Sequence, residues 1–249
     1  MRGLTKAADL FIRDAQIKNV AIQNNFFMLA VNGILAGFFI ALTGFAFQMT
    51  IILTKSIMAA AAILPLGFIL CDTFKSDLFS THFLYSIASY SKNQSWKQFA
   101  LSTLCVTLFN IFGIIIFILM IWGAGQIPQI TPIALNEITM KTDAGYFATF
   151  VKGIIGCAAS CMGVFTARRT DSAFEKVMSI WISMFTLGLC GFEHATLDLY
   201  HFLVCQDTTL MRAYFPNLAL TYIGNLVGGL CFGAIITGMT HLKHESIKQ

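Results

Sequence analysis

Charged side chains are scarce in this chain. Asp, Glu, Lys and Arg make up 11% of its 249 residues, 57% of the residues are hydrophobic, and the mean hydropathy is +0.74. Soluble domains carry about 25% charged residues, so this composition excludes an ordinary soluble domain and indicates an integral membrane protein. The modest net charge of +4 gives no indication of a nucleic-acid partner.

Motifs of metal and enzyme sites are also missing. The seven cysteines form no CxxC pair and fall in apolar stretches, so we expect free packing thiols, without a disulfide framework or a zinc site. The chain has neither a GxSxG nucleophile elbow nor an HExxH pair. We therefore expect no enzyme, no cofactor and no resident metal.

Long apolar runs are what the chain does have. A helix needs roughly 20 such residues to cross a bilayer. The runs fall near residues 26–54, 56–71, 98–123, 144–167, 177–206 and 214–240. The sequence predicts an all-α membrane protein with six transmembrane helices, in which residues 1–249 form one domain.

Residues 1–20 differ from these runs, because apolar residues alternate there with charged ones. The segment contains acidic residues and no continuous apolar core, which is unlike a secretory signal. We expect an amphipathic helix that lies in the membrane interface.

Positive charges are distributed unevenly over the predicted loops. One side of the membrane would hold Arg2, Lys6, Arg13, Lys18, Lys92, Lys97, Arg168, Arg169, Lys176, Lys243 and Lys248, and the other would hold Lys55, Lys141 and Arg212. Because cytoplasmic loops are enriched in Lys and Arg, we expect both termini in the cytoplasm. The compact size and the few loops suggest a prokaryotic inner-membrane protein.

The second and fifth runs are interrupted by polar residues. "SIMAAAAILPLGFILC" is followed by "DTFKSDLFST", and "VMSIWISMFTLGLCGF" is followed by "EHATLD". Matching interruptions in two halves of a membrane protein indicate a binding site near the midplane, between inverted repeats. Irregular backbone is tolerated at that depth only where it is buried or lines a cavity.

Short echoes between the halves support such a repeat. "GILAG" at Gly33 resembles "GIIGC" at Gly153, and "FNIFG" resembles "GNLVGG". Asn110 and Asn225 in these last two motifs follow the first and second interruptions at nearly equal distances. We predict a first inverted repeat over 21–124 and a second over 143–240.

These motifs together resemble the formate/nitrite transporter family. The likeness rests on "DLFST" at Asp77–Thr81, "GFEHATLDL" from Gly191, "VKGIIG" and "IGNLVGG". It implies an aquaporin-like inverted 3+3 repeat with broken helices 2 and 5, assembled as a homopentamer. It also implies a channel or secondary transporter for small monovalent anions of weak acids. Formate or nitrite is the expected substrate; hydrosulfide, acetate or lactate is the alternative within the family.

The chain departs from the family pattern at several positions. Lys75 and Ser76 stand where Gly and a small residue are usual, Ser80 replaces Thr, and Asp198 replaces Asn. Cys157 stands where an amide donor is typical. The chain is thus expected to be a divergent member.

The resemblance and the interruptions together give candidate transport residues. His194 titrates near physiological pH and is expected to contact the anion or give it a proton. Ser80 and Thr81 offer hydroxyls at a half-helix end, where anions bind. Lys152, a rare intramembrane lysine, is expected in a vestibule that attracts anions.

Apolar side chains are expected on either side of His194. Phe79, Leu187 and Phe68 occupy positions that resemble the family's constrictions. An ion stripped of water there is far less permeant than the neutral acid, so we predict passage as the protonated acid.

Other polar residues are expected to support the structure. These are Glu193, Asn110, Asn225 and Asp77. Glu193 should face away from the anion path and accept hydrogen bonds from loop amides or a neighbouring protomer. Lys75 is expected to pair with Asp72 or Asp77.

A divalent-metal transporter is the alternative from another class. His194, Asp198, His201 and Cys205 would lie on one face of a continuous helix, and all are plausible metal ligands. An interruption near Glu193 would separate them.

Overall fold

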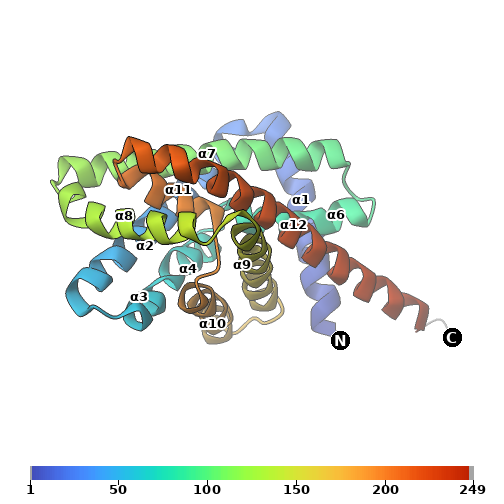
Figure 1. Ribbon diagram of the computed structural model, residues 1–249. Helices are drawn as coiled ribbons and strands as arrows, with labels where there is room; N and C mark the ends of the chain where they lie inside the picture. The colour runs from blue at the N-terminus through green and yellow to red at the C-terminus, as the bar shows by residue number, and fades with distance from the viewer. Residues whose placement is uncertain (1, 247–249) are drawn as a thin grey trace.

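The computed structural model describes residues 2–246, and every regular element within that range is helical. The helices, in chain order, are α1 (Arg2–Asn24), α2 (Phe26–Thr54), α3 (Ile57–Ile63), α4 (Pro65–Thr73), α5 (Phe79–His82), the 3₁₀ helix η1 (Phe83–Tyr85), α6 (Ser86–Tyr90), α7 (Trp96–Gly123), α8 (Ile127–Asp143), α9 (Tyr146–Ala167), α10 (Ala173–Cys190), α11 (Ala195–Val204) and α12 (Thr208–Ser246). Figure 1 shows them in one bundle.

Six membrane spans are formed by these helices, as predicted. Helices α2, α7, α9, α10 and α12 are each long and apolar enough to cross a bilayer. The remaining span begins with the shorter apolar stretch Ile57–Thr73 and continues through α5, η1 and α6. Helix α2 has the predicted bounds, whereas α10 and α12 begin earlier than the apolar runs do, at Ala173 and Thr208.

Helix α8 was not predicted. It joins α7 to α9 and packs against α2, α11 and α12. Its buried residues Ile127, Ile130, Ala134 and Ile138 recur every three or four positions, so one apolar face covers the bundle.

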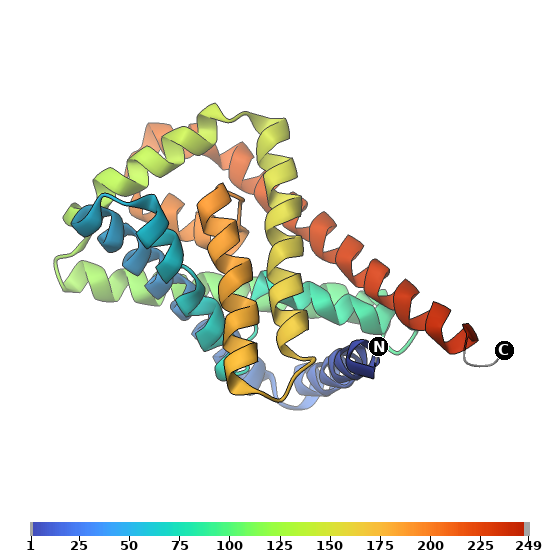
Figure 2. The same ribbon diagram turned by 90° about the horizontal axis from the view of Figure 1, so that it is seen from below.

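Two tight helix pairs form the frame of the bundle. Helix α2 packs against α7, and α9 packs against α12. A Cβ on Gly37 of α2 would overlap the carbonyl oxygen of Asn110, and one on Gly228 of α12 would overlap that of Ile154. Glycine allows this close approach of helices, for which lipid supplies no hydrophobic drive. Figure 2 shows α9 and α12 crossing on one side of the molecule.

The first interruption lies between α4 and α5. Helix α4 ends at Thr73, and Lys75 takes a left-handed conformation with φ of 54°. The side-chain oxygen of Asn110 accepts from the backbone N–H of Phe79 at 2.8 Å. Its amide nitrogen donates to the carbonyls of Gly33 at 2.9 Å and Asp77 at 2.8 Å.

The second interruption is held in the same way. Gly191 ends α10 in a left-handed conformation with φ of 63°, and Phe192 N–H donates back to Leu187. The side-chain oxygen of Asn225 accepts from Ala195 N–H at 3.0 Å, and its nitrogen donates to the carbonyls of Gly153 at 2.9 Å and Glu193 at 3.2 Å. The matching schemes agree with the inverted 3+3 repeat and the broken helices 2 and 5.

Helix α1 was predicted to be amphipathic and interfacial. It is helical, but its apolar face lies against the bundle, with Ala7, Ala8, Phe11 and Ala15 all buried. The protein therefore covers this face, and the interfacial position of the helix stays a prediction. The start of α1 and the end of α12 lie on the same side of the molecule in both views (Figures 1 and 2). The side chains of Arg2, Lys243 and Lys248 lie outside the described residues.

Candidate functional site

Two of the cavities in the bundle concern the predicted site, and they share no lining residue. One, of about 310 Å³, lies beside α1 and is called the α1 cavity. The other, of about 260 Å³, lies beside α8 and is called the α8 cavity. Phe68 and Thr81 line the α1 cavity, and Leu187, Lys141 and Lys152 line the α8 cavity.

His194 and Ser80 meet between the two interruptions. His194 Nε2 lies 2.7 Å from Ser80 Oγ, and the residues are 1% and 0% exposed. His194 Nδ1 accepts from the backbone N–H of Leu197 at 3.4 Å, which makes His194 the N-cap of α11. A neutral imidazole with Nδ1 as acceptor carries its hydrogen on Nε2, so Nε2 donates to Ser80.

Local chain geometry accounts for this meeting. The turn at Gly191 redirects the chain so that His194 starts a new helix, and α5 presents Ser80 from the other half. Ser80 and Thr81 lie inside α5. The side chain of Asn110 accepts a hydrogen bond from the N–H of Phe79, the first residue of this helix. Thr81 Oγ1 donates to the carbonyl of Leu78 at 3.3 Å.

The apolar candidates surround this pair unevenly. The rings of Phe68 and His194 meet edge to face with centroids 4.9 Å apart. Leu187, which is 1% exposed, lies on the α8-cavity side. Phe79 packs against Tyr222 and Phe83, with ring centroids at 5.0 and 4.8 Å. Phe68 and Leu187 thus line the cavities, whereas Phe79 lines neither of the two.

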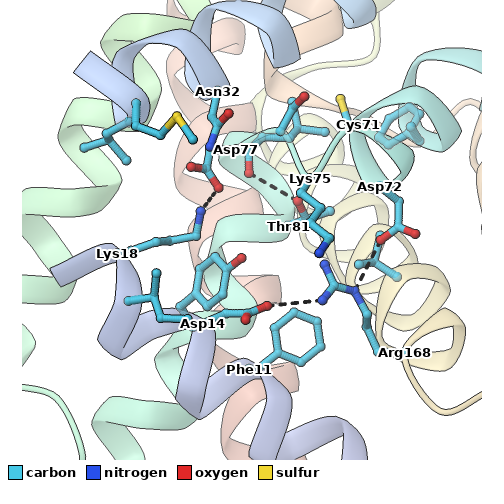
Figure 3. A pocket seen from close by; sticks show the side chains of 18 residues that line it. Phe11, Asp14, Lys18, Asn32, Cys71, Asp72, Lys75, Asp77, Thr81 and Arg168 are labelled. Carbon is cyan, nitrogen blue, oxygen red and sulfur yellow. Dashed lines mark hydrogen bonds and ion pairs between the residues drawn. The ribbon is translucent and has the colours of Figure 1, made fainter. Parts of the chain in front are cut away.

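Ion pairs bind α1 across the α1 cavity (Figure 3). Lys18 of α1 pairs with Asp77. Arg168, which follows α9, pairs with Asp14 of α1 at 3.1 Å and with Asp72 at 3.4 Å. The predicted pairing of Lys75 is wrong, because Arg168 and Lys18 take both of its candidate partners; we find no ion pair for Lys75 within residues 2–246.

A lysine that the sequence analysis missed lies in the α8 cavity. Lys141 Nζ pairs with Glu193, and it lies 2.5 Å from Asp198 Oδ1. Both carboxylates are almost fully buried, with side-chain exposures of 2% and 1%. Burial alone would lower the pKa of Lys141, but Asp198 and Glu193 together outweigh it and hold the pKa well above its usual value.

Glu193 therefore has a different partner from the one expected. It lines the α8 cavity and accepts from Lys141, whereas backbone amides or a second protomer were predicted. Lys152 also lines this cavity, is partly buried, and accepts from Glu193 N–H through its backbone carbonyl at 3.3 Å.

The four side chains considered as metal ligands turn to separate partners. His194 contacts Ser80, Asp198 contacts Lys141, His201 approaches Glu137, and Cys205 Sγ approaches the carbonyl of Asp207 at 4.0 Å. In the part of the chain that the structure describes, no group of three or more His, Cys, Asp and Glu side chains could hold a metal. The metal-transporter alternative thus lacks support from the geometry.

A model of the formate/nitrite transporter family matches residues 7–239. The chain belongs to this family.

Relatives of this family member include channels and transporters and not enzymes. The formate channel FocA of Escherichia coli K12 is 25% identical over 204 residues, covering 71% of this chain and 70% of FocA. The uncharacterized transporter YrhG of Bacillus subtilis is 25% identical over 236 residues, covering 89% and 88%. The nitrite transporter NirC of Escherichia coli K12 is 26% identical over 168 residues, covering 63% and 61%.

Solved structures share the fold of this formate/nitrite transporter family member. An FNT family ion channel superposes with a TM-score of 0.81 at 20% identity, covering 98% of each chain. A pentameric formate channel with formate bound gives a TM-score of 0.65 at 19% identity, covering 88% of this chain and 95% of that one.

One departure from the family pattern is visible at the meeting of the two halves. The thiols of Cys157 and Cys161 both lie 3.4 Å from the carbonyl oxygen of Ser80 and donate to it. Both residues are fully buried, and all seven cysteines are free, as predicted. In this family member, thiols thus hold the backbone of Ser80 where an amide donor was expected.

Proposed function

We propose that this protein is a channel or secondary transporter for small monovalent anions of weak acids, with formate or nitrite as substrate. The observation that carries the proposal is one buried hydrogen bond, His194 to Ser80, where the two interrupted helices meet. A path through this point would offer the substrate a single polar contact.

The physical chemistry favours passage of the neutral acid. Lys152, which lines the α8 cavity, would attract an anion into it. Phe68 and Leu187, on opposite sides of His194, would strip its water. Moving a small anion without its water into an apolar passage costs much free energy, whereas moving the protonated acid does not. The anion must therefore gain a proton before the constriction.

The assembly and location follow from the family. We propose a homopentamer in the cytoplasmic membrane with both termini in the cytoplasm, built from repeats over 21–124 and 143–240. A pentameric formate channel of similar fold supports the assembly, and the uneven loop charges support the orientation.

Flux through proteoliposomes tests the proposal. The parent protein should carry formate or nitrite without added metal, and hydrosulfide, acetate and lactate should be tested beside them. His194→Asn keeps an acceptor that can cap α11, but it lacks the Nε2 atom that contacts Ser80 and it cannot titrate. We expect it to lose most of the flux and to change the dependence of flux on pH.

Two further variants make this test specific. Ser80→Ala removes the hydroxyl that faces His194 and should lower flux, whereas Lys97→Ala, at an exposed position of α7, should leave flux unchanged. Unaltered rate and pH profile in His194→Asn would refute the central role of this histidine. Failure of the parent to carry any of the anions would refute the proposed function.

A further inference from the structure

A second titratable pair lies in the α8 cavity, apart from His194. Glu137 of α8 and His201 of α11 both line the cavity, and Glu137 Oε2 lies 3.4 Å from His201 Nε2. Their side chains are 10% and 3% exposed. A carboxyl and an imidazole buried this close can share a proton.

Neighbouring side chains fix the position of the carboxyl. Gln48 of α2, which is fully buried, donates from Nε2 to Glu137 Oε2 at 3.3 Å. The hydroxyl of Tyr200 donates to Oε1 of the same Gln48 at 3.1 Å, which fixes the orientation of the amide. Glu137 is thus held at the cavity wall by partners that do not themselves titrate near neutral pH.

Buried polar atoms in the same cavity lack hydrogen-bond partners. Neither ring nitrogen of His201 makes a hydrogen bond among the described residues, and neither does Oδ2 of Asp198. These residues are 3% and 1% exposed, and both line the cavity. Buried polar groups are nearly always satisfied, so such atoms point to a bound species that completes them.

Charge in the cavity indicates what that species is. The charged and titratable groups around the pair are Lys141 of α8, Lys152 of α9, Glu193 before α11, Asp198 and Tyr200 of α11, and Tyr214 of α12. With all carboxyls ionised, Glu137, Glu193 and Asp198 would outnumber the two lysines. Lys141 is already occupied by Glu193 and Asp198, so the surplus negative charge falls on Glu137.

We propose that the Glu137–His201 pair is a proton-binding site that loads a proton onto the anion before it reaches His194. The inference rests on the proposed function and names the source of the proton. Burial raises the pKa of Glu137 to about 7, which agrees with a carboxyl that stays protonated near neutrality.

The step is a simple proton transfer. The O–H bond of the Glu137 carboxyl breaks as an O–H bond forms on the anion, which leaves Glu137 as a carboxylate and the substrate as a neutral acid. His201 accepts a hydrogen bond from the protonated carboxyl and stabilises the shared proton. A hydronium ion from bulk water then gives a proton to the Glu137 carboxylate and leaves a water molecule, so no other reactant is needed.

Infrared difference spectroscopy tests the site without any transport. Between about pH 5 and about pH 8, the parent should show a protonated-carboxyl C=O band that disappears as pH rises. Glu137→Gln should remove this band, and Glu175→Gln, on an exposed carboxylate of α10, should leave it in place. If the parent lacks the band, or if the band persists in Glu137→Gln, Glu137 is not the proton site.

Flux tests whether the proton is used. Without the site, only acid protonated in bulk water enters, so flux through Glu137→Gln should fall about tenfold for each pH unit of rise. The parent should keep its flux nearly constant until about pH 7, where Glu137 loses its proton. His201→Asn should shift the loss of flux and the loss of the infrared band together.

The outcomes separate this inference from the proposed function. Identical pH profiles for parent and Glu137→Gln would refute the loading role while leaving the channel in place. If flux required sodium ions at fixed pH, the site would bind a metal cation and not a proton. If the parent carried no anion, the proposed function would fail, and the infrared titration would still decide whether Glu137 holds a proton.

Discussion

The α1 cavity and the α8 cavity have similar volumes, about 310 and about 260 Å³, but their charges are arranged differently. In the α1 cavity, Lys18 and Arg168 pair with carboxylates on a neighbouring element, and two of these pairs bind α1 to the bundle. In the α8 cavity, one lysine serves two buried carboxylates while a third carboxyl faces an imidazole.

The difference shows how similar cavities can serve different purposes. Matched pairs of opposite charge hold a helix in place. In the α1 cavity the buried group that titrates near neutral pH is a cation, because burial lowers the pKa of Lys18 to about 7. A surplus of carboxyls in a buried site is costly when ionised, so such a site favours proton uptake. Variants that break one cavity or the other should therefore have different consequences.

The largest effect is expected for Lys141→Met. Removing the ammonium leaves Glu193 and Asp198 as buried carboxylates without a cation, which costs about 3–5 kcal/mol in the free energy of unfolding. The melting temperature in detergent, followed by tryptophan fluorescence, should fall sharply. Lys6→Met breaks the exposed pair with Asp171, 2.7 Å apart, and should change the melting temperature little. Equal losses in the two variants would contradict the expectation that the buried ion pairs stabilise the protein more than the exposed one.

A smaller loss is expected for Lys18→Met in the α1 cavity. Asp77 would lose its cation, but α1 can move away and admit water, so the cost should lie near the lower end, about 3 kcal/mol. The loss should concentrate on α1, and its amide hydrogens should exchange faster than those of α7. Arg13→Met, on the exposed side of the same helix, is the control. Unchanged exchange in α1 would show that the pair does not hold the helix.

Local sequence patterns account for the part of the fold that was predicted. The two interruptions, and the asparagines that follow them, are visible because each lies in a short motif with an echo in the other half. The structure shows the reason, since Asn110 and Asn225 make equivalent hydrogen bonds to their interruptions. The meeting of Ser80 with His194 could be expected for the same reason, because each lies at one interruption.

Pairings between distant elements could not be predicted. Lys141 is 52 residues from Glu193, and nothing in the polar stretch around Lys141 indicates that α8 folds over the cavity. Helix α8 is too polar to resemble a membrane span, so the sequence predicts a loop there. The pairing of Asp77 with Lys18 was missed because the apolar face of α1 looked suited to lipid, whereas the bundle covers it.

A third prediction concerns the contact between α9 and the second interruption. A Cβ on Gly156 of α9 would overlap the carbonyl oxygen of Glu193, so Gly156→Ala should displace the residues that lead to His194. Overpacking of this kind costs about 1–3 kcal/mol, and flux should fall because His194 moves relative to Ser80. Gly238→Ala, a helical glycine with nothing within 4 Å of the added Cβ, should be neutral or slightly stabilising. Full flux in Gly156→Ala would contradict the prediction that His194 depends on this close contact for its position.

The last prediction concerns how stability depends on pH. The pKa of Glu137 is about 7 in the folded protein and 4.5 when unperturbed, so between these values the folded state binds more protons than the unfolded state. The free energy of unfolding must then fall as pH rises through this window, by at most about 1.4 kcal/mol for each pH unit. Glu137→Gln has no proton to lose, so the melting temperature of the parent relative to this variant should decrease from low to neutral pH. Glu175→Gln, at an exposed carboxylate of α10, is the matched control. A flat difference for both variants would mean that Glu137 is ionised throughout, and the contrast between the two cavities would then lie in geometry alone.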